Sequence, residues 1–374
     1  MTVIIFIIML SILVLVHEFG HFIIAKLNGI RVEEFGMGLP PKLVSVKRGE
    51  TAYSINLLPF GGFVKLTGEE TTISSTNDPR SFASKSVGQR AAVLLAGVVM
   101  NVMLALVLFY AYFLLNNFKT SQMPLFFDHK FTFGNAKVYG TLVADVVPGY
   151  PAEKAGIKPG EIIVTVDNIE VKDVAGLREA IKNKEGKELT VVTENIGNPD
   201  FSDGFRSVTL VPQLSEEGVT SLGVYLTDTA VISYDSFLER VFVGPLHSYN
   251  VLSYSIGGMA NILGVSIEEK SVEPLSQSVA GPVGIFRIVD TIVDIGGRRA
   301  VLVMLDFMGL MSLSLAFLNV MPFPALDGGR LLFVVIEGIA GRRINPKIEM
   351  LVHQVGMMFL LGLLVLITIK DLFI

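Results

Sequence analysis

The sequence predicts a multi-span α-helical membrane protein with four transmembrane helices, a membrane-associated β-hairpin and one extracytoplasmic β-rich domain. Of the 374 residues, 51% are hydrophobic, and the mean hydropathy is +0.58, which is unusually apolar for a soluble globule. Four runs are long enough to cross a hydrocarbon core of about 30 Å at about 1.5 Å per residue: residues 3–27, 91–115, 301–321 and 351–369. The formal charge of −5 gives no indication of a nucleic-acid partner.

The basic residues near the ends of these runs predict the orientation. Short basic segments favour the cytoplasm, so the segments between the first and second runs and between the third and fourth runs are expected there. The basic residues concerned are Lys26, Arg31, Lys42, Lys47, Arg48, Lys65, Arg80, Lys85 and Arg90, followed by Arg330, Arg342, Arg343 and Lys347. Both termini and the long segment between the second and third runs then face outward.

The chain divides into a membrane core in two parts, residues 1–118 and 299–374, with other elements between and within them. Residues 31–68 alternate weakly and carry Pro59 and Gly61-Gly62, which predicts a β-hairpin or sheet near the cytoplasmic face. Residues 236–298 are expected to form helices on the membrane surface. Within them, 236–265 is apolar but interrupted by Pro245 and Gly257-Gly258. A fifth span there would put the two basic segments on opposite sides.

A soluble domain is predicted at residues 136–214. Strand-like runs alternate there with turn signals around one helical pattern: YGTLVADVV, EIIVTVD, ELTVVTEN and SVTLVPQL, with VAGLREAIKN. The phrase PGYPAEKAGIKPGEIIVTVDNIEV resembles a PDZ domain of the bacterial type. A generic small β-domain is the alternative.

The first apolar run contains an HExxH pattern formed by His17, Glu18 and His21. The four-residue spacing puts both imidazoles on one face of a helix. Ionisable side chains inside a membrane are costly and usually functional. If the helix starts near residue 2 at the outer surface, His17 lies about 22 Å deep and His21 about 28 Å deep, close to the cytoplasmic leaflet. Because the chain has no cysteine, histidine and carboxylate must hold any zinc ion here.

A catalytic zinc site needs a third protein ligand at the same depth and an open position for water. Asp327 follows the third apolar run, and two prolines before it allow the backbone to turn the carboxylate inward. The alternative is that Asp327 caps the helix that follows. We expect His17, His21 and Asp327 to bind Zn²⁺ and Glu18 to act as general base. Three further histidines lie outside any ligand spacing and are assigned no metal: His129, His247 and His353.

Together these motifs resemble the site-2 protease family of intramembrane zinc metalloproteases, most closely the bacterial regulator-of-sigma-E protease group. HEFGH in the first run, LDG after the third and the PDZ-like domain between them carry the resemblance, which covers nearly the whole chain. GMGLPPKLVSVKRGETAYSINLLPFGGFVKLTGE is similar to the group's membrane re-entrant β-loop, and RSFASKSVGQRAAVLLAGVVMN to the entry of its second span. Two departures are the missing proline in Gly97-Val98-Val99-Met100-Asn101 and a single PDZ domain where many relatives have two.

The resemblance implies a zinc endopeptidase of the bacterial cytoplasmic (inner) membrane, with its active site near the cytoplasmic side and its PDZ domain outside. Its expected partners are the lipid bilayer and single-span membrane proteins, such as anti-sigma factors or signal-peptide remnants, after a prior extracytoplasmic cut. The PDZ domain would bind a ligand peptide or a substrate ectodomain, either to filter substrates or to recruit them.

Substrate binding is expected at the hairpin and beside the third run. An unwound substrate is predicted to add a strand to residues 51–66, with Tyr53, Ser54, Ile55 and Asn56 as the substrate-binding residues. The resemblance implies that Asn319, in N-x-x-P-x-P-x-x-D, binds the substrate backbone; a helix–helix hydrogen bond is the alternative.

Gly97 and Asn101 form a small-x-x-x-polar face on the second run, for which helix packing and a role near the active site are equally weighted. Two other classes of function stay open for the whole chain. One is a non-catalytic membrane scaffold that uses its PDZ domain, although a scaffold has no need of Glu18 in a costly position. The other is a zinc transporter, which predicts zinc flux and no peptide cleavage.

Overall fold

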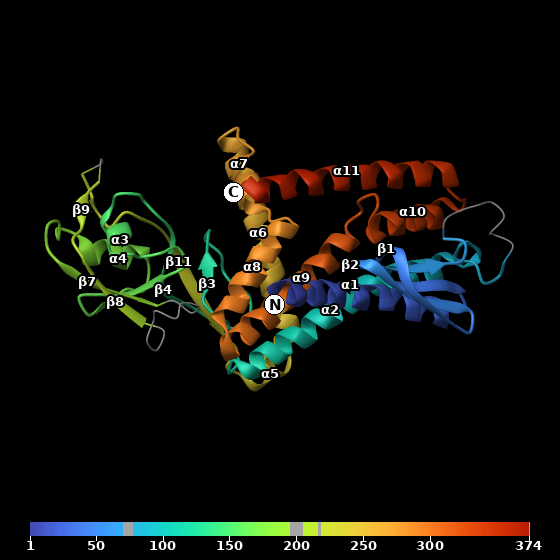
Figure 1. The fold of residues 1–374 in the computed structure, drawn as a ribbon, viewed down its shortest axis with the longest axis horizontal. Coiled ribbons are helices and arrows are strands. Elements are labelled where there is room, and N and C mark those ends of the chain that lie inside the picture. Colours follow the sequence, from blue (N-terminus) through green and yellow to red (C-terminus); the bar gives the residue numbers. More distant parts are fainter. Residues whose placement is uncertain (70–77, 195–204, 216–217, 374) are drawn as a thin grey trace. The chain divides into compact units, whose positions relative to one another are not determined.

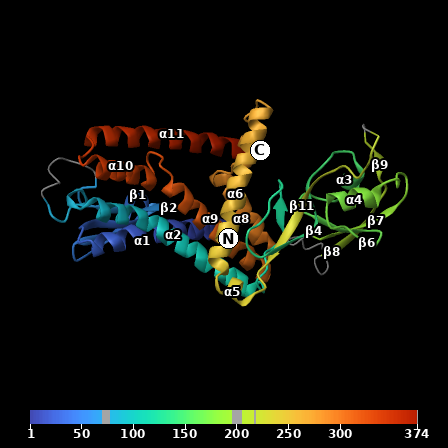
Figure 2. The same cartoon turned by 180° about the vertical axis from the view of Figure 1, so that it is seen from behind.

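The computed structural model describes residues 1–69, 78–194, 205–215 and 218–373, and the chain folds into two compact units (Figure 1, Figure 2). The first unit comprises residues 1–108, 279–290 and 305–374. The second unit comprises residues 109–278 and 291–304.

Within the described residues, four helices are long and apolar enough to cross a bilayer, and they lie where the apolar runs predict them. They are α1 (Thr2–Leu27), α2 (Val87–Leu115), α9 (Gly297–Val320) and α11 (Pro346–Phe373). Local interactions end α1. The Asn28 side chain donates to the Ile24 carbonyl, and Gly29 adopts the left-handed conformation with φ +64°. One turn of 3₁₀ helix, Phe82–Ser84, precedes α2.

The amphipathic helix α10 (Asp327–Ala340) lies between α9 and α11 in the chain. It ends at Gly341, whose φ of +64° is the left-handed conformation that glycine adopts without strain. Helix α11 then begins with Pro346, at a position where the missing N–H costs no helical hydrogen bond.

The predicted hairpin is present as β1 (Val32–Arg48) and β2 (Thr51–Leu66), but its pairing is more complex than a simple hairpin. Next to the turn, residues 42–48 of β1 pair with residues 51–56 of β2. Shifts of register follow, and β1 and β2 meet a second time further from the turn.

In this second pairing, the first part of β1 lies between two parts of β2. Phe35 pairs with Tyr53 on one side and with Val64 on the other, and Gly36 likewise pairs with Ser54 and Phe63. The sheet therefore has four segments in the order 42–48, 51–56, 32–37 and 62–66. Segments 42–48 and 62–66 are its two edges, and we call 62–66 the inner edge.

The second unit contains the predicted β-domain. Seven strands form one sheet, with the order β3-β11-β4-β5-β7-β8 and with β6 paired to β5. Its strands are β3 (Met123–Leu125), β4 (Asn135–Val146), β5 (Ile162–Val166), β6 (Ile169–Glu170), β7 (Leu189–Glu194), β8 (Phe205–Leu210) and β11 (Val224–Ser233). A short pair, β9 (Gln213–Leu214) and β10 (Thr220–Ser221), stands apart from this sheet.

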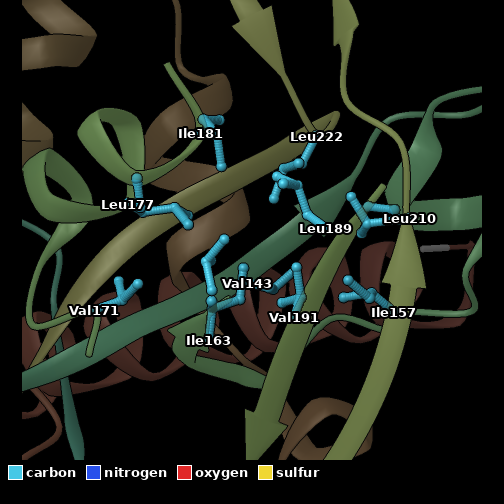
Figure 3. Packing of buried hydrophobic residues seen from close by; sticks show 13 residues of the cluster. Val143, Ile157, Ile163, Val171, Leu177, Ile181, Leu189, Val191, Leu210 and Leu222 are labelled. Carbon is cyan, nitrogen blue, oxygen red and sulfur yellow. The ribbon is translucent and has the colours of Figure 1, made fainter. Parts of the chain in front are cut away.

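Two helices cover the apolar core of this domain, α3 (Pro151–Lys154) and α4 (Val174–Ile181). The Asp173 side chain caps α4 by accepting from the Gly176 N–H at 2.7 Å. Aliphatic side chains from strands and helices fill the core, including Val143, Ile163, Leu177, Leu189 and Val191 (Figure 3). The sheet extends beyond the predicted limits of 136–214, because β11 pairs with β4 from residue 224 to residue 233.

The helices predicted at 236–298 are α5 (Phe237–Val241), α6 (Val243–Glu268), α7 (Glu273–Ser278) and α8 (Pro282–Ile295). The interruptions expected from Pro245 and from Gly257-Gly258 do not occur, because all three residues lie inside α6. Pro245 stands in the first turn, where its missing N–H is tolerated. The paired glycines make room for the ring of Phe127, which lies 3.0 Å from where a Cβ on Gly257 would stand. Helix α6 is not among the four helices apolar enough to span a membrane.

Candidate metal centre

Helix α1 presents its two histidines on one buried face. His17 and His21 are each 8% exposed, and their Nε2 atoms lie 3.1 Å apart. The rings meet edge to face, with their centroids 4.8 Å apart. The four-residue spacing therefore brings both Nε2 atoms to one point, as the helical period predicts.

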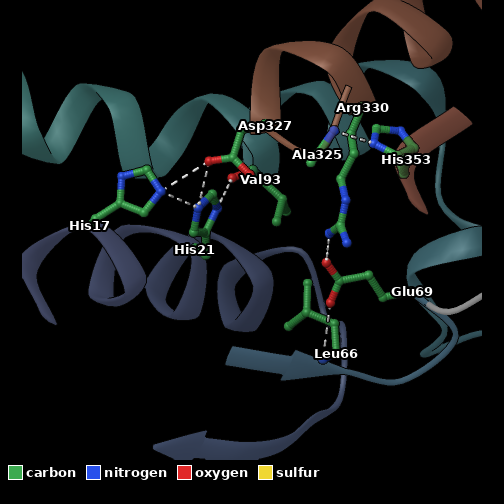
Figure 4. Close-up of polar contacts among 9 residues, drawn as sticks. All are labelled: His17, His21, Leu66, Glu69, Val93, Ala325, Asp327, Arg330 and His353. Carbon is green, nitrogen blue, oxygen red and sulfur yellow. Dashed lines mark hydrogen bonds and ion pairs between the residues drawn. The ribbon is translucent and has the colours of Figure 1, made fainter. Parts of the chain in front are cut away.

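Asp327 reaches this point from the other end of the chain. Its Oδ2 lies 3.0 Å from Nε2 of His17 and 3.1 Å from Nε2 of His21 (Figure 4). Asp327 is the first residue of α10, whose N-cap is Leu326, and no side-chain cap bond forms there. The carboxylate thus contacts the imidazoles instead of capping its own helix.

The three atoms fit a zinc ion. Four ligands at about 2.0–2.1 Å in a tetrahedron lie about 3.3 Å from one another, close to the observed separations of 3.0, 3.1 and 3.1 Å. Two imidazole nitrogens and one carboxylate oxygen are a donor set typical of catalytic zinc, with the fourth position left for water. Across the described part of the chain, this is the one group of three or more such side chains found with converging ligand atoms.

Helix α2 forms a wall behind the two imidazoles. The carbonyl of Val93 accepts from Nδ1 of His21 at 2.8 Å, which leaves the Nε2 lone pair of that ring facing the centre. The Asn101 carboxamide lies 3.3 Å from Nδ1 of His17. Since residues 93, 97 and 101 share one helical face, Gly97 stands between these two contacts.

The glycine at position 97 is required by space. A Cβ there would lie 2.5 Å from Nε2 of His21 and 2.6 Å from Cε1 of His17. Gly20 on α1 allows equally close packing, because a Cβ would lie 2.4 Å from the carbonyl oxygen of Ala96. The sequence left helix packing and a role near the active site open for Gly97 and Asn101. In the structure both residues contact the imidazoles of the metal centre.

The turn before Asp327 is held by contacts that sequence reasoning missed. Ala325 has φ +77°, an uncommon conformation for a residue with a Cβ, and its N–H donates to Nδ1 of His353 on α11 at 2.9 Å (Figure 4). The paired glycines after Asp327 allow the chain to pack closely against this turn, because a Cβ on Gly328 would lie 2.2 Å from the carbonyl oxygen of Met321. His353 lies outside the metal's donor set, as expected, but it anchors the backbone that presents a ligand.

Glu18 lines a cavity of about 790 Å³ together with His21 and Asp327. The inner edge of the sheet forms another wall of this cavity, and Cγ of Glu18 lies 3.3 Å from where a Cβ on Gly62 would stand. An ion pair between Arg330 and Glu69 borders the cavity (Figure 4). The same pair also borders a second cavity of about 880 Å³. A carboxylate, two of the three converging ligand side chains and an edge strand of the sheet thus adjoin one space.

The predicted substrate-binding residues, 53–56, do not line the cavity that Glu18 lines. Residues 52–55 pair on both sides, with 44–47 and with 34–37, so strand addition at Tyr53, Ser54 and Ile55 conflicts with the observed register. The Asn56 side chain is itself committed, donating to the Gly38 carbonyl at 2.9 Å. A second pairing of β1 covers the strand that a simple hairpin leaves open.

Asn319 is the next-to-last residue of α9 and is half-buried. It does not line either cavity, and no side-chain hydrogen bond of it is found within the described residues. The structure thus leaves the Asn319 carboxamide without the helix–helix hydrogen bond considered as its alternative role.

Comparisons with known proteins agree with this centre. A family model described as peptidase family M50 matches residues 5–363. The chain is 34% identical to a putative zinc metalloprotease of Clostridium perfringens over 96% of this chain and 95% of the relative. It is 27% identical to zinc metalloprotease RasP of Oceanobacillus iheyensis over 99% of this chain and 98% of the relative. A solved PDZ domain of an SdrC-like protein from Listeria monocytogenes is 18% identical, with a TM-score of 0.21, and aligns to 26% of this chain and 93% of that domain.

Proposed function

Because the chain belongs to peptidase family M50 and is a zinc metalloprotease, we propose that it cleaves the transmembrane segments of single-span membrane proteins inside the bilayer. The observation that carries this proposal is the convergence of His17, His21 and Asp327 beside the cavity that Glu18 lines. All of these residues belong to the first unit, which holds the long apolar helices α1, α9 and α11 for most of their length.

In the proposed reaction, His17, His21 and Asp327 hold Zn²⁺, and Glu18 moves the proton. When bound, the zinc ion lowers the pKa of a water molecule and polarises the scissile carbonyl. Glu18 accepts a proton as that water attacks the carbonyl carbon, and it then donates the proton to the leaving amine. The next residue after a ligand points off the ligand face, which is why Glu18 serves as base and not as a fourth ligand.

A substrate helix must unwind before its peptide bond is attacked, because its carbonyls are engaged in helical hydrogen bonds. The inner edge, residues 62–66, supports an added substrate strand: it is an edge of the sheet, it lines the cavity, and it lies against Glu18. Asn319, at the end of α9, is proposed to hold the substrate backbone.

The proposed substrates are anti-sigma factors or signal-peptide remnants that have already been cut outside the membrane. The basic segments support a metal centre near the cytoplasmic side of the bacterial inner membrane and a β-domain outside. The β-domain, as a PDZ domain, would then bind a substrate ectodomain or a newly exposed chain end.

Cleavage by the reconstituted full-length protein tests the proposal. With a panel of single-span substrates in proteoliposomes, we expect wild type to cleave and Glu18→Gln to bind zinc normally but cut at least about 10³-fold more slowly, since the proton carrier is lost. Intact cleavage in Glu18→Gln would rule out this residue as the base. Zinc flux without cleavage would favour a transporter. Persistence of the biological role in Glu18→Gln would favour a scaffold.

Cross-linking tests the docking edge, and the absence of native cysteine makes single-cysteine variants clean probes. We compare Lys65→Cys on the inner edge with Lys47→Cys on the opposite edge, both in a Glu18→Gln background with a substrate that carries one cysteine near its scissile bond. A disulfide at position 65 and none at position 47 is expected. Equal cross-linking at the two edges contradicts the proposal. For Asn319, full cleavage by Asn319→Ala contradicts its substrate role.

A further inference from the structure

Asn101 is a fully buried polar side chain in the middle of α2, with no exposed surface at all. Burying a carboxamide among apolar helices costs free energy unless both of its ends are hydrogen-bonded. Its Nδ2 lies 3.3 Å from Nδ1 of His17, whereas its Oδ1 has no hydrogen-bond partner in the described part of the chain. One end of this amide therefore has a ring nitrogen before it, and the other is left unpaired.

The chemistry of a metal-binding imidazole decides which end faces the ring. If Nε2 of His17 offers its lone pair to a metal, the neutral ring carries its hydrogen on Nδ1, and the group facing Nδ1 must be an acceptor. A half-turn of the carboxamide about its last side-chain bond exchanges Oδ1 and Nδ2. The turned amide presents Oδ1 to the Nδ1–H and places Nδ2 where the unpaired oxygen stood.

We propose that Asn101 is a positioning residue for His17: its Oδ1 accepts the Nδ1–H, fixing the tautomer and the ring orientation that the metal centre needs. This inference rests on the proposed metal centre. The two ligating imidazoles then have different supports. His21 is oriented by the main-chain carbonyl of Val93, which side-chain substitution leaves in place, while His17 depends on one side chain.

Helix packing does not account for the Asn101 side chain. The hydrogen bond that joins α9 to α2 at this level runs from the Ser312 hydroxyl to the main-chain carbonyl of Asn101, at 2.8 Å. Since the main chain makes that bond, the carboxamide is free to serve the ring. Ser312 therefore offers a matched control, because its loss disturbs the same helix contact and leaves the imidazole's partner intact.

Zinc affinity of the full-length protein, measured by competition with a chelator, tests the proposal without requiring turnover. Asn101→Leu removes the acceptor at similar volume and should weaken zinc binding about 10–100-fold. Asn101→Asp restores an acceptor and should stay within about 3-fold of wild type. Ser312→Ala should also keep the wild-type affinity. Thermal unfolding of each variant with zinc removed shows that the chain is folded.

Three results would overturn the role of Asn101: wild-type zinc affinity in Asn101→Leu, failure of Asn101→Asp to recover it, or an equal loss in Ser312→Ala. A wild-type protein that binds no zinc, or a His17→Ala variant that binds it normally, overturns the metal centre itself. The two failures are therefore distinguishable, because the second appears before any change at position 101 is made.

Discussion

Each of the two units contains a buried histidine–asparagine cluster, and the first of them holds the three converging ligand atoms. His17 and His21 lie in the first unit, and His247, only 2% exposed, lies on α6 in the second. Each cluster also includes a fully or almost fully buried asparagine, Asn101 in the first and Asn250 in the second. Burial of a histidine beside an asparagine therefore does not by itself identify a functional site.

The partners of the second cluster explain why it is structural. Asn250 donates to the Tyr234 hydroxyl at 3.1 Å and to the Phe133 carbonyl at 2.7 Å, and its Oδ1 accepts from the N–H groups of Thr132 and Phe133. The Tyr234 hydroxyl lies 3.2 Å from Nδ1 of His247 and can donate to it. Aromatic rings surround the imidazole, those of Phe109, Phe113 and Tyr234.

What separates the clusters is the carboxylate and the cavity. The first cluster has Asp327 against both rings and a cavity beside it. In the second cluster, both ends of the asparagine amide are paired, and burial lowers the pKa of His247 to about 3, so the ring stays neutral.

The largest expected effect is the loss of zinc and cleavage when the carboxylate of the first cluster is replaced. Asp327→Asn removes the anionic ligand, and because zinc contributes several kcal/mol to the reaction, we expect cleavage to fall about 10³-fold or more with loss of bound zinc. His247→Phe keeps an aromatic ring in the second cluster and should leave zinc content unchanged. Metal analysis and cleavage of the two variants side by side check this. Loss of zinc in His247→Phe would break the comparison.

An intermediate effect is expected at Gly97. In Gly97→Ala the added Cβ stands 2.5 Å from Nε2 of His21, so the imidazoles must move and zinc affinity should fall about 10–100-fold. Gly88→Ala on the same helix meets nothing within 4 Å and is the matched control. Chelator competition measures both. An unchanged affinity in Gly97→Ala would mean that α2 is not a fixed wall of the centre.

The smallest effect concerns acid stability. The pKa of His247 is about 3 when folded against 6.5 as its ordinary value, so the unfolded chain binds the extra proton as pH falls below 6.5 and stability is lost there. About 2 kcal/mol should be lost between pH 8 and pH 5. Unfolding of the full chain at both pH values, compared with His247→Phe, isolates this contribution. A stability difference between the two proteins that does not change with pH contradicts a neutral buried ring.

Much of the fold follows from the pattern of apolar residues. The four long helices lie close to the four apolar runs because helix length and composition are local properties. His17, His21 and Asp327 come together because helical period and depth constrain them independently. The main β-domain is also present, although β11 extends it past residue 214.

The parts that sequence reasoning missed depend on neighbours distant in the chain. The register of β1 and β2 includes a second pairing that alternation alone does not reveal, and it leaves residues 62–66 at an edge of the sheet. Helix α6 continues through its paired glycines because Phe127, more than 120 residues earlier, fills the space they leave. The part played by Asn101 becomes visible only when His17 lies beside it.

The wide separation of the three ligands along the chain has a consequence for biosynthesis. His17 leaves the ribosome 310 residues before Asp327, and the turn that presents Asp327 is clasped by His353 on the last long helix. A nascent chain with only its early helices inserted therefore lacks both the third ligand and the clasp. We therefore expect the three-ligand zinc site to assemble only after translation has passed Asp327.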